Sequence, residues 1–367
     1  MALPDTVAEA ERLMVICNAC RYCEGHCAVF PAMELRLAFS GPDLRYLANL
    51  CHGCGSCFHH CQYAPPHEFD VNVPRVFAEL RRETYRRHAW PRFLGPLFAR
   101  NGLATGIVTA AACVLFVAAG AALAGPAAWS AQLGPGAFYR VVPHWGMVAL
   151  FGLASAYVLV ALAAAGHAFW REAGQAGASA ALLGRAGLEA ATLRYLDGGG
   201  GGCTYPGEKP AMGRRVYHHL TAWGFLSCFA ATCVAAVLEW LGRSAPYPWW
   251  SAPVLLGTAG GIGLLVGPAG LLALKARSDP EPFPRDPMDV AFLLLLLLCS
   301  ATGFLVLFLR ATPAMGVLLL VHLGAVMGLF LTMPYGKFVH GFYRYAALLR
   351  WAIERSRPHE EAPPEVV

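Results

Sequence analysis

The sequence predicts an all-α membrane protein in which a small cysteine-rich N-terminal domain precedes a bundle of six transmembrane helices. Hydrophobic residues make up 57% of the 367 positions and charged residues only 14%, which excludes a disordered chain and argues against a water-soluble enzyme. Six apolar segments, each of about 20 residues, follow residue 100. Eight of the 13 cysteines lie between Cys17 and Cys61.

Residues 1–100 are polar to mixed in character, and we expect them to stay in the cytoplasm. The first 15 residues, MALPDTVAEAERLMV, carry acidic residues among the apolar ones and have no continuous apolar core. They therefore do not resemble a secretion signal. In a reducing compartment, clustered cysteines bind metals more often than they form disulfides.

The N-terminal cysteines form the spacing C-x2-C-x2-C-x3-C twice, which is typical of two-cluster ferredoxins. Three thiolates on one tight loop hold three irons of a cubane, and the fourth comes from the other motif. One predicted [4Fe–4S] cluster therefore takes Cys17, Cys20, Cys23 and Cys61. The other predicted cluster takes Cys51, Cys54, Cys57 and Cys27. Because Met33–Leu50 looks helical, we expect an α-helical ferredoxin-like cytoplasmic domain.

A pair of structural zinc sites is the alternative for these cysteines. Zinc motifs usually pair two C-x-x-C knuckles across a longer spacer, so the spacing favours iron–sulfur clusters. The histidines between the cysteines, His26, His52, His59 and His60, are interpreted as polar surface residues.

Each of the six apolar segments is long enough to span a membrane as a helix. They are Leu103–Leu123, Val148–Phe169, Leu220–Trp240, Val254–Leu274, Val290–Leu309 and Ala314–Tyr335. The connections after the first, third and fifth segments carry one arginine each, whereas the other connections and the C-terminal end carry many cations. By the positive-inside rule, both termini are therefore predicted to be cytoplasmic. This topology also accounts for the formal charge of +5 without a nucleic-acid partner.

The stretch Pro74–Arg100 holds seven arginines and two glutamates just before the first predicted span. One interpretation is an electrostatic anchor to anionic headgroups or a docking face for a partner. The other is a solvated helix face that obeys the positive-inside rule.

Ionisable residues inside a membrane span are costly, so His322 in the last segment is a functional candidate together with His340. The two are 18 residues apart, which is five helical turns, so we expect them to face the same way, about 27 Å apart along the helix axis. Each would then bind one b-type haem. His218 or His219 is the predicted partner of His340 at the inner side, and His144 that of His322 at the outer side. The pattern thus predicts one or two haems.

Two glycine-rich stretches are not interpreted as ligand sites. Gly198–Gly202 is followed by Cys203 but no strand precedes it, so a cytoplasmic loop is favoured over a phosphate loop. Gly257–Gly270 lies within a span and predicts close helix packing. Nothing in the sequence indicates a site for an organic substrate, so any enzymatic role would be that of an electron-transfer subunit.

Several motifs together resemble the tricarballylate-utilisation B / citrate-utilisation B family. They are the stretch Cys17–Cys27, the second cysteine motif through Phe69, DGGGGGCTYPGE at 197–208, RVYHHL at 215–220 and PYGKFVH at 334–340. The resemblance covers nearly the whole chain in order. It implies a subunit of the bacterial cytoplasmic (inner) membrane with two [4Fe–4S] clusters and haem b. It also implies that this subunit reoxidises an FAD-dependent dehydrogenase of the tricarballylate dehydrogenase type and reduces membrane quinone.

The sequence predicts three parts: a di-cluster domain at 1–100 with its basic segment, a haem-binding membrane domain at 101–345 and a cytoplasmic tail at 346–367. Other functions stay open. The chain could serve a heterodisulfide-reductase-like or another anaerobic respiratory complex, or act as a membrane-anchored iron–sulfur redox sensor. The sensor would leave His322 and His340 unexplained. A zinc-stabilised scaffold is a third alternative and predicts a colourless protein.

Overall fold

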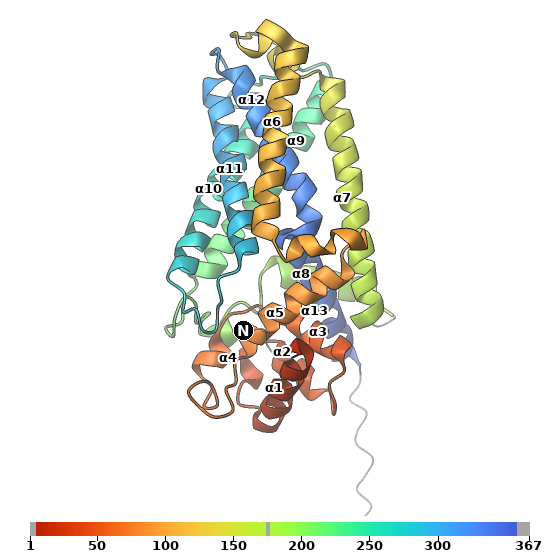
Figure 1. Cartoon of the computed structure of the whole chain (residues 1–367), viewed down its shortest axis with the longest axis vertical. Helices are drawn as coiled ribbons and strands as arrows, with labels where there is room; N and C mark the ends of the chain where they lie inside the picture. Colours follow the sequence, from red (N-terminus) through yellow and green to blue (C-terminus); the bar gives the residue numbers. More distant parts are fainter. Residues whose placement is uncertain (1–4, 174–176, 358–367) are drawn as a thin grey trace, which may run out of the picture.

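The computed structural model describes residues 5–173 and 177–357. Within these ranges the regular structure is helical, and the only β-type pairing is an isolated bridge between Cys203 and Ala211. Figure 1 shows a bundle of long helices standing on a layer of shorter ones. The predicted all-α class is therefore confirmed.

The six long helices coincide with the six apolar segments of the sequence. They are α6 (Asn101–Ala124), α7 (His144–Ala173), α9 (Gly213–Trp240), α10 (Ala252–Ala276), α11 (Pro287–Leu309) and α12 (Met315–Thr332). All six are long and apolar enough to cross a membrane, so the prediction of a multi-pass membrane protein is confirmed. The turns η3 (Gly125–Ala128) and η4 (Ala137–Arg140) follow α6 and precede α7.

Short helices form the N-terminal layer below the bundle. They are α1 (Thr6–Cys20), η1 (Glu24–His26), α2 (Val29–Glu34), α3 (Gly41–Leu50), α4 (Ser56–His59), α5 (Val73–His88) and η2 (Arg92–Phe98). The stretch Met33–Leu50, predicted to be helical, contains the end of α2 and all of α3, with a break between them. The chain leaves α2 after Glu34, and Ser40 begins α3 by accepting a hydrogen bond from the Asp43 amide at 3.3 Å. Pro42 lies in the first turn of α3, where its missing N–H costs nothing.

The segment between His322 and His340 is not one helix, so the premise of the 18-residue argument is wrong. After α12 the chain makes two short turns, η6 (Met333–Tyr335) and η7 (Lys337–Val339), and His340 begins α13 (His340–Ser356). Pro334 cannot donate a backbone hydrogen bond, and Gly336 is extended, so the helical ladder stops here. The predicted tail at 346–367 includes most of α13, while 358–367 lie outside the described residues.

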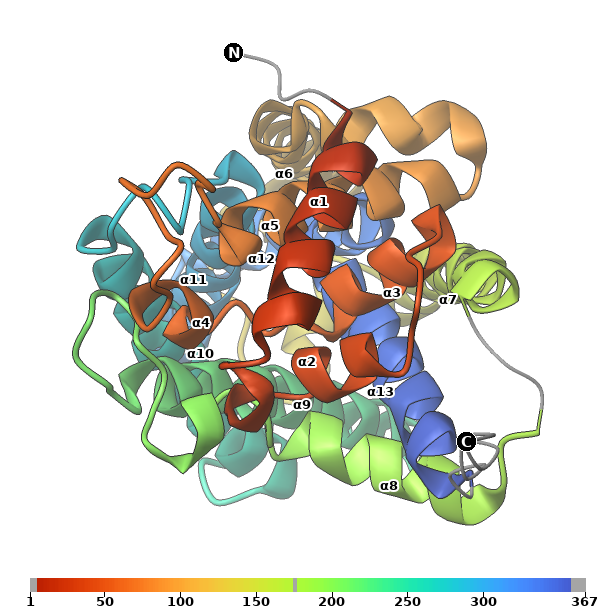
Figure 2. The same cartoon turned by 90° about the horizontal axis from the view of Figure 1, so that it is seen from below.

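Helix α13 packs back onto the N-terminal layer, beside α3 and α8 (Ala180–Ala191), as Figure 2 shows from below. Glu354 of α13 accepts hydrogen bonds from Arg36, from Tyr46 at 2.9 Å and from Arg350 at 2.9 Å. Arg350 also donates to Asp43 at 2.8 Å. The two ends of the described chain are therefore joined at one end of the bundle, as an even number of spans requires.

Helices α9 and α10 approach each other through glycines. A Cβ atom on Gly224 would lie 2.9 Å from the Gly260 carbonyl oxygen, and one on Gly260 would lie 2.7 Å from the Gly224 carbonyl oxygen. Such contacts leave no room for a side chain, so only glycine permits this backbone approach. The close packing predicted for Gly257–Gly270 is present.

Candidate metal centres

The first set of cysteines lies where α1 ends and the chain turns into η1. Cys17 and Cys20 belong to the last turns of α1, Cys23 follows directly, and Cys61 comes from the turn after α4. Burial, together with the neighbouring thiols of Cys23, Cys61 and Cys20, raises the pKa of Cys17 to about 12. The fold therefore brings together the four cysteines that the sequence assigns to one cluster.

The second set is more deeply placed. Cys51 and Cys54 are 8% and 7% exposed, and Cys57 lies in α4. Burial raises the pKa of Cys27, and its closest charged neighbours are Cys54 and Cys51. The same two cysteines are the nearest charged neighbours of Cys57. Cys27, from the first motif, thus lies with the second set, and Cys61, from the second motif, lies with the first set.

The surroundings of these thiols fit thiolate ligands of iron. The Gly53 amide donates to the Cys51 sulfur at 3.3 Å, and backbone amides of Val29 and Phe30 donate to Cys27. Such N–H donors stabilise charged sulfur and tune cluster potentials. All eight thiols are free, and none is in a disulfide. Among the described residues no three His, Cys, Asp or Glu side chains converge as around a single ion, but a cubane binds each thiolate at a different iron.

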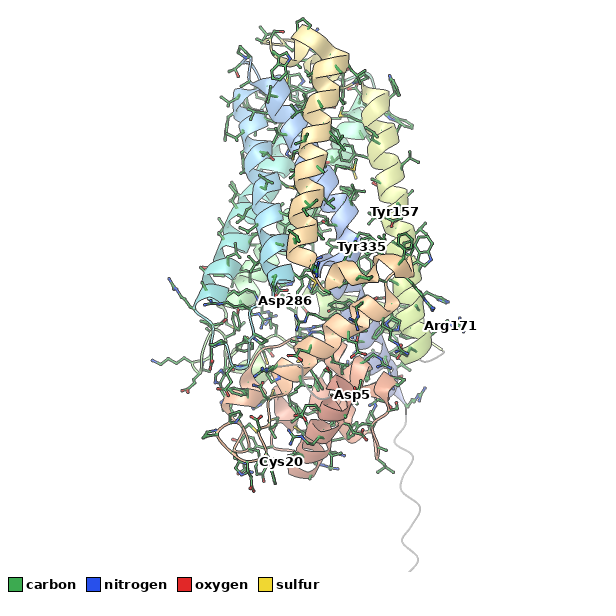
Figure 3. The ribbon with its side chains drawn as sticks, viewed as in Figure 1. Asp5, Cys20, Tyr157, Arg171, Asp286 and Tyr335 are labelled. Carbon is green, nitrogen blue, oxygen red and sulfur yellow. The ribbon has the colours of Figure 1, made fainter. Side chains whose placement is uncertain are left out.

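The two sets are adjacent but differ in their depth in the molecule. Cys54 lies close enough to Cys23 to raise the pKa of Cys23, and Cys23 has the same effect on Cys57. The two sets therefore lie side by side. Figure 3 shows Cys20, of the first set, at the end of the molecule farthest from the bundle. The second set faces the bundle.

The loop at 197–206 packs on both cysteine motifs. The buried Cys203 thiol donates to the Cys54 carbonyl at 3.0 Å, and the Thr204 hydroxyl donates to the same oxygen at 3.4 Å. Gly199 has φ +82°, and a Cβ there would lie 2.6 Å from the Gly25 carbonyl oxygen. Only glycine fits this conformation and this contact. The loop that precedes α9 is therefore part of the wall around the cysteine sets.

His218 and His340 face each other at the end of the bundle next to the N-terminal layer. Their ring centroids are 6.0 Å apart and their planes are inclined by 79°. Two imidazoles bound to one iron would have centroids about 6 Å apart, because each metal–nitrogen bond is ~2.0 Å. The spacing therefore fits a bis-histidine site. His219 has no such contact with His340. Its ring instead donates a hydrogen bond to the Thr192 carbonyl.

The hydrogen bonds of the two rings leave nitrogens available for a metal. His340 Nδ1 donates to the Lys337 carbonyl at 2.5 Å, which fixes the tautomer with Nε2 as the acceptor. Burial lowers the pKa of His340 to about 3, so the ring is neutral, the form that binds metals. His218 Nδ1 is buried and has no hydrogen-bond partner. A buried nitrogen without a protein partner is costly, so the Nδ1 atom of His218 is free to bind a metal.

An ion triad holds the segment that presents His340. Asp289 of α11 pairs with Lys337 at 2.7 Å and with Lys275 of α10 at 2.8 Å. Because the Lys337 carbonyl accepts the hydrogen bond from His340 Nδ1, this triad also fixes the orientation of the imidazole.

Arginines connect the histidine pair to the second cysteine set. Arg214 lies one turn before His218 and donates to the Gly53 carbonyl. Arg344 lies one turn after His340 and donates to the Cys51 carbonyl at 2.6 Å. Arg81 donates to the same Cys51 oxygen at 3.2 Å. No ion pair joins these three arginines to a carboxylate in the described part of the chain, so their charges face the cysteine loop uncompensated.

His52 lies between these features and is not the surface residue that the sequence predicted. It is 9% exposed, its Nδ1 donates to the Leu50 carbonyl at 3.0 Å, and its Nε2 is buried without a partner. Arg344, Arg214 and His218 are its ionisable neighbours. His52, next to Cys51, therefore occupies the space between the second set and the histidine pair.

The outer candidates are not brought together. His322 Nδ1 lies 3.0 Å from the Thr302 hydroxyl oxygen, and that hydroxyl donates to the Leu298 carbonyl at 2.7 Å. His322 is therefore the donor to Thr302. His144 begins α7 and packs against the Tyr139 ring at 5.1 Å. In residues 5–173 and 177–357, no ring contact joins His144 to His322.

Sequence reasoning missed the roles of four residues near the second set: His52, Cys203, Arg214 and Arg344. One signal was available for the two arginines. Arg214 and Arg344 are each four residues from a predicted haem histidine, which places them one helical turn away on the same face.

The fold and the cysteine sets define a membrane protein with an N-terminal iron–sulfur-type domain. The family model described as the Fer4-like domain of citrate utilization protein B matches residues 10–87, and the model of citrate utilization protein B matches residues 99–361. The chain is 49% identical to citrate utilization protein B of Escherichia coli over 359 residues, covering 97% of this chain and 94% of that protein. The chain belongs to the citrate utilization protein B family. No solved structure matches it.

Proposed function

We propose that this chain is a membrane electron-transfer subunit. Electrons pass from a reduced flavoprotein dehydrogenase of the tricarballylate dehydrogenase type through two [4Fe–4S] clusters and haem b to membrane quinone. The observation that carries the proposal is the His218–His340 pair, 6.0 Å apart and linked by Arg344 to the second cysteine set. The Fer4-like domain fits an iron–sulfur electron-transfer role.

The proposed cluster ligands are the two cysteine sets. Cys17, Cys20, Cys23 and Cys61 hold one cluster, and Cys51, Cys54, Cys57 and Cys27 hold the other. When bound, the clusters and the haem each accept and release one electron. The protein supplies thiolates, backbone N–H donors and the cationic surroundings that set the potentials.

The depth of the two sets supports a direction. The first set lies toward the end of the molecule away from the bundle, where a soluble partner can approach (Figure 3). The second set is buried against Arg214, Arg344 and His52, beside the histidine pair. The first set is therefore the donor side, and the second set is the side from which electrons enter the membrane.

The proposed haem ligands are His218 and His340. The free Nδ1 of His218 and the fixed tautomer of His340 support this choice over His219. A second haem between His144 and His322 stays a prediction, because no facing pair supports it.

The cytoplasmic membrane is the proposed location, with both termini on the cytoplasmic side. The N-terminal layer and α13 lie at the same end of the bundle, and that end carries most of the cationic residues (Figure 1). The positive-inside rule supports this orientation.

The proposal is tested by an anaerobic visible absorption spectrum of the detergent-purified chain before and after dithionite, with iron and haem measured per chain. We expect broad bleaching with sharp low-spin haem bands, and iron in excess of haem iron by about eight per chain. Bleaching without haem bands would point to a cluster-only carrier or sensor. A colourless zinc protein would refute electron transfer.

A further inference from the structure

A cavity of about 650 Å³ opens where the N-terminal layer meets α7. It lies between the C-terminal end of α5, the chain leading into η2, and the last turns of α7. Its lining residues are Arg87, His88, Ala89, Trp90, Arg92, Ala164, Ala168, Arg171 and Glu172. None of them belongs to the cysteine sets or to the histidine pair.

The position of the cavity is that of a membrane–water interface. Arg171 and Glu172 lie in the last turn of the membrane helix α7, and Ala168 and Ala164 lie one and two turns farther into the span. Trp90 is 41% exposed and Phe93, in η2, is 77% exposed, as expected for side chains in contact with lipid at this level. The Tyr335 hydroxyl donates to the Trp90 carbonyl at 2.9 Å and holds the wall in place (Figure 3).

The cavity carries net positive charge. Its single carboxylate, Glu172, is already paired with Arg45 at 2.5 Å and with His88 at 2.5 Å, and Arg87 lies 3.5 Å away. In the part of the chain that the structure describes, the Arg92 and Arg171 side chains make neither an ion pair nor a hydrogen bond. Both are exposed. Two arginines therefore remain to bind an anion from outside.

The arginines of the segment before the first span have different surroundings in the fold. Arg81 turns inward to the cysteine loop, and Arg82 lies 3.9 Å from Asp286. Arg87 and Arg92 line the cavity. Only part of the segment is therefore an exposed basic surface.

We propose that this cavity binds the headgroup of an anionic phospholipid. Arg92 and Arg171 hold the phosphate, since guanidinium groups bind phosphate through paired hydrogen bonds. The small side chains of Ala164 and Ala168 leave a groove on α7 along which an acyl chain lies. Basic pockets at the cytoplasmic face of transmembrane helices take such headgroups.

The test uses the full chain in detergent, titrated with short-chain phosphatidylglycerol, with lipid binding measured by native mass spectrometry. The variant Arg92→Gln/Arg171→Gln is compared with Arg75→Gln/Arg277→Gln. The control removes the same charge from two exposed arginines that do not line the cavity. We expect the first variant to bind about 30-fold more weakly, since each arginine near an anionic headgroup contributes about 1 kcal/mol. The control is expected to change little.

Other outcomes would overturn the proposal. Equal weakening in both variants would mean general surface charge, and equal binding of phosphatidylcholine would mean that the headgroup charge is not recognised. Displacement of the lipid by inorganic phosphate alone would indicate a free anion. Binding of a short-chain quinone in place of the lipid would make the cavity a quinone site. Iron and haem per chain, measured on each variant, check the fold independently of the proposed electron transfer.

Discussion

The two ends of the membrane bundle, the one next to the N-terminal layer and the one away from it, both contain partly buried histidines, but their surroundings differ. At the inner end, His218 and His340 come from two helices and face each other at 6.0 Å, and His218 Nδ1 has no partner. Toward the outer end, His322 donates to the Thr302 hydroxyl at 3.0 Å, and His144 packs against Tyr139. His218 and His340 therefore face each other across helices, whereas His144 and His322 each contact other side chains and not one another.

This difference shows that a histidine in a membrane helix is informative only with its neighbours. Burying an imidazole costs free energy unless a hydrogen bond or a metal compensates it. A hydroxyl on the next helix is enough, as Thr302 shows for His322. Two facing imidazoles beside a cationic, cysteine-lined loop need something between them.

The largest expected effect is the loss of haem from the inner site. His340→Ala and His218→Ala each remove one of two axial ligands, so haem per chain should fall to near zero if the inner haem is the only one. The pyridine haemochrome assay measures this ratio. His219→Ala is the matched control, because its ring does not face His340.

Retention of the full haem content by His340→Ala would refute the inner site. If His340→Ala lost half of the haem and His322→Ala lost the other half, the prediction of a second, outer haem would be supported.

Removing one thiol of the second set should affect iron and leave haem. Cys54→Ser is expected to lower iron by about four per chain, since a cubane rarely survives the loss of a thiolate. Iron analysis and the Soret band measure the two cofactors separately. Cys233→Ser, at an exposed position on α9, is the control that should retain all iron. Loss of haem together with iron would mean that the two sites fold as one unit.

The uncompensated arginines should raise the potential of the second cluster. Arg344→Gln removes one partly buried positive charge close to Cys51. Without that charge, the reduced and more negative state of the cluster is less stable. The midpoint potential should fall by on the order of 50–100 mV, as for one charge at ~8 Å in a medium of moderate dielectric. Redox titration followed by EPR measures the shift. Arg344→Lys keeps the charge and should restore most of the lost midpoint potential. An unchanged potential in Arg344→Gln would contradict the proposed effect of Arg344 on the second cluster.

The smallest expected effect is at the outer histidine. Thr302→Val keeps the shape of the side chain but leaves His322 Nδ1 without its acceptor, which costs about 1–3 kcal/mol. A lower thermal unfolding midpoint with unchanged haem content is the expected result. A drop in haem content would show that His322 is a ligand after all.

Much of the architecture is readable from local pattern. Six apolar segments of membrane-spanning length become six helices, because in lipid every backbone polar group must be paired within its own helix. The repeated cysteine spacing predicts which thiols become neighbours, because short loops hold residues such as Cys51 and Cys54 close together. The family was also predicted correctly from its motifs.

The sequence by itself therefore determined the spans and the family, which follow from local composition and from the order of the motifs along the chain. Its assignment of the eight cysteines to two clusters stays a prediction. Only the tertiary structure decided that His218, and not His219, faces His340, because the chain breaks at Pro334 and Gly336 and α13 starts in a new direction. It also decided that Arg214 and Arg344 reach the cysteine loop. Contacts between residues more than 150 positions apart depend on how helices pack, and no local periodicity encodes that.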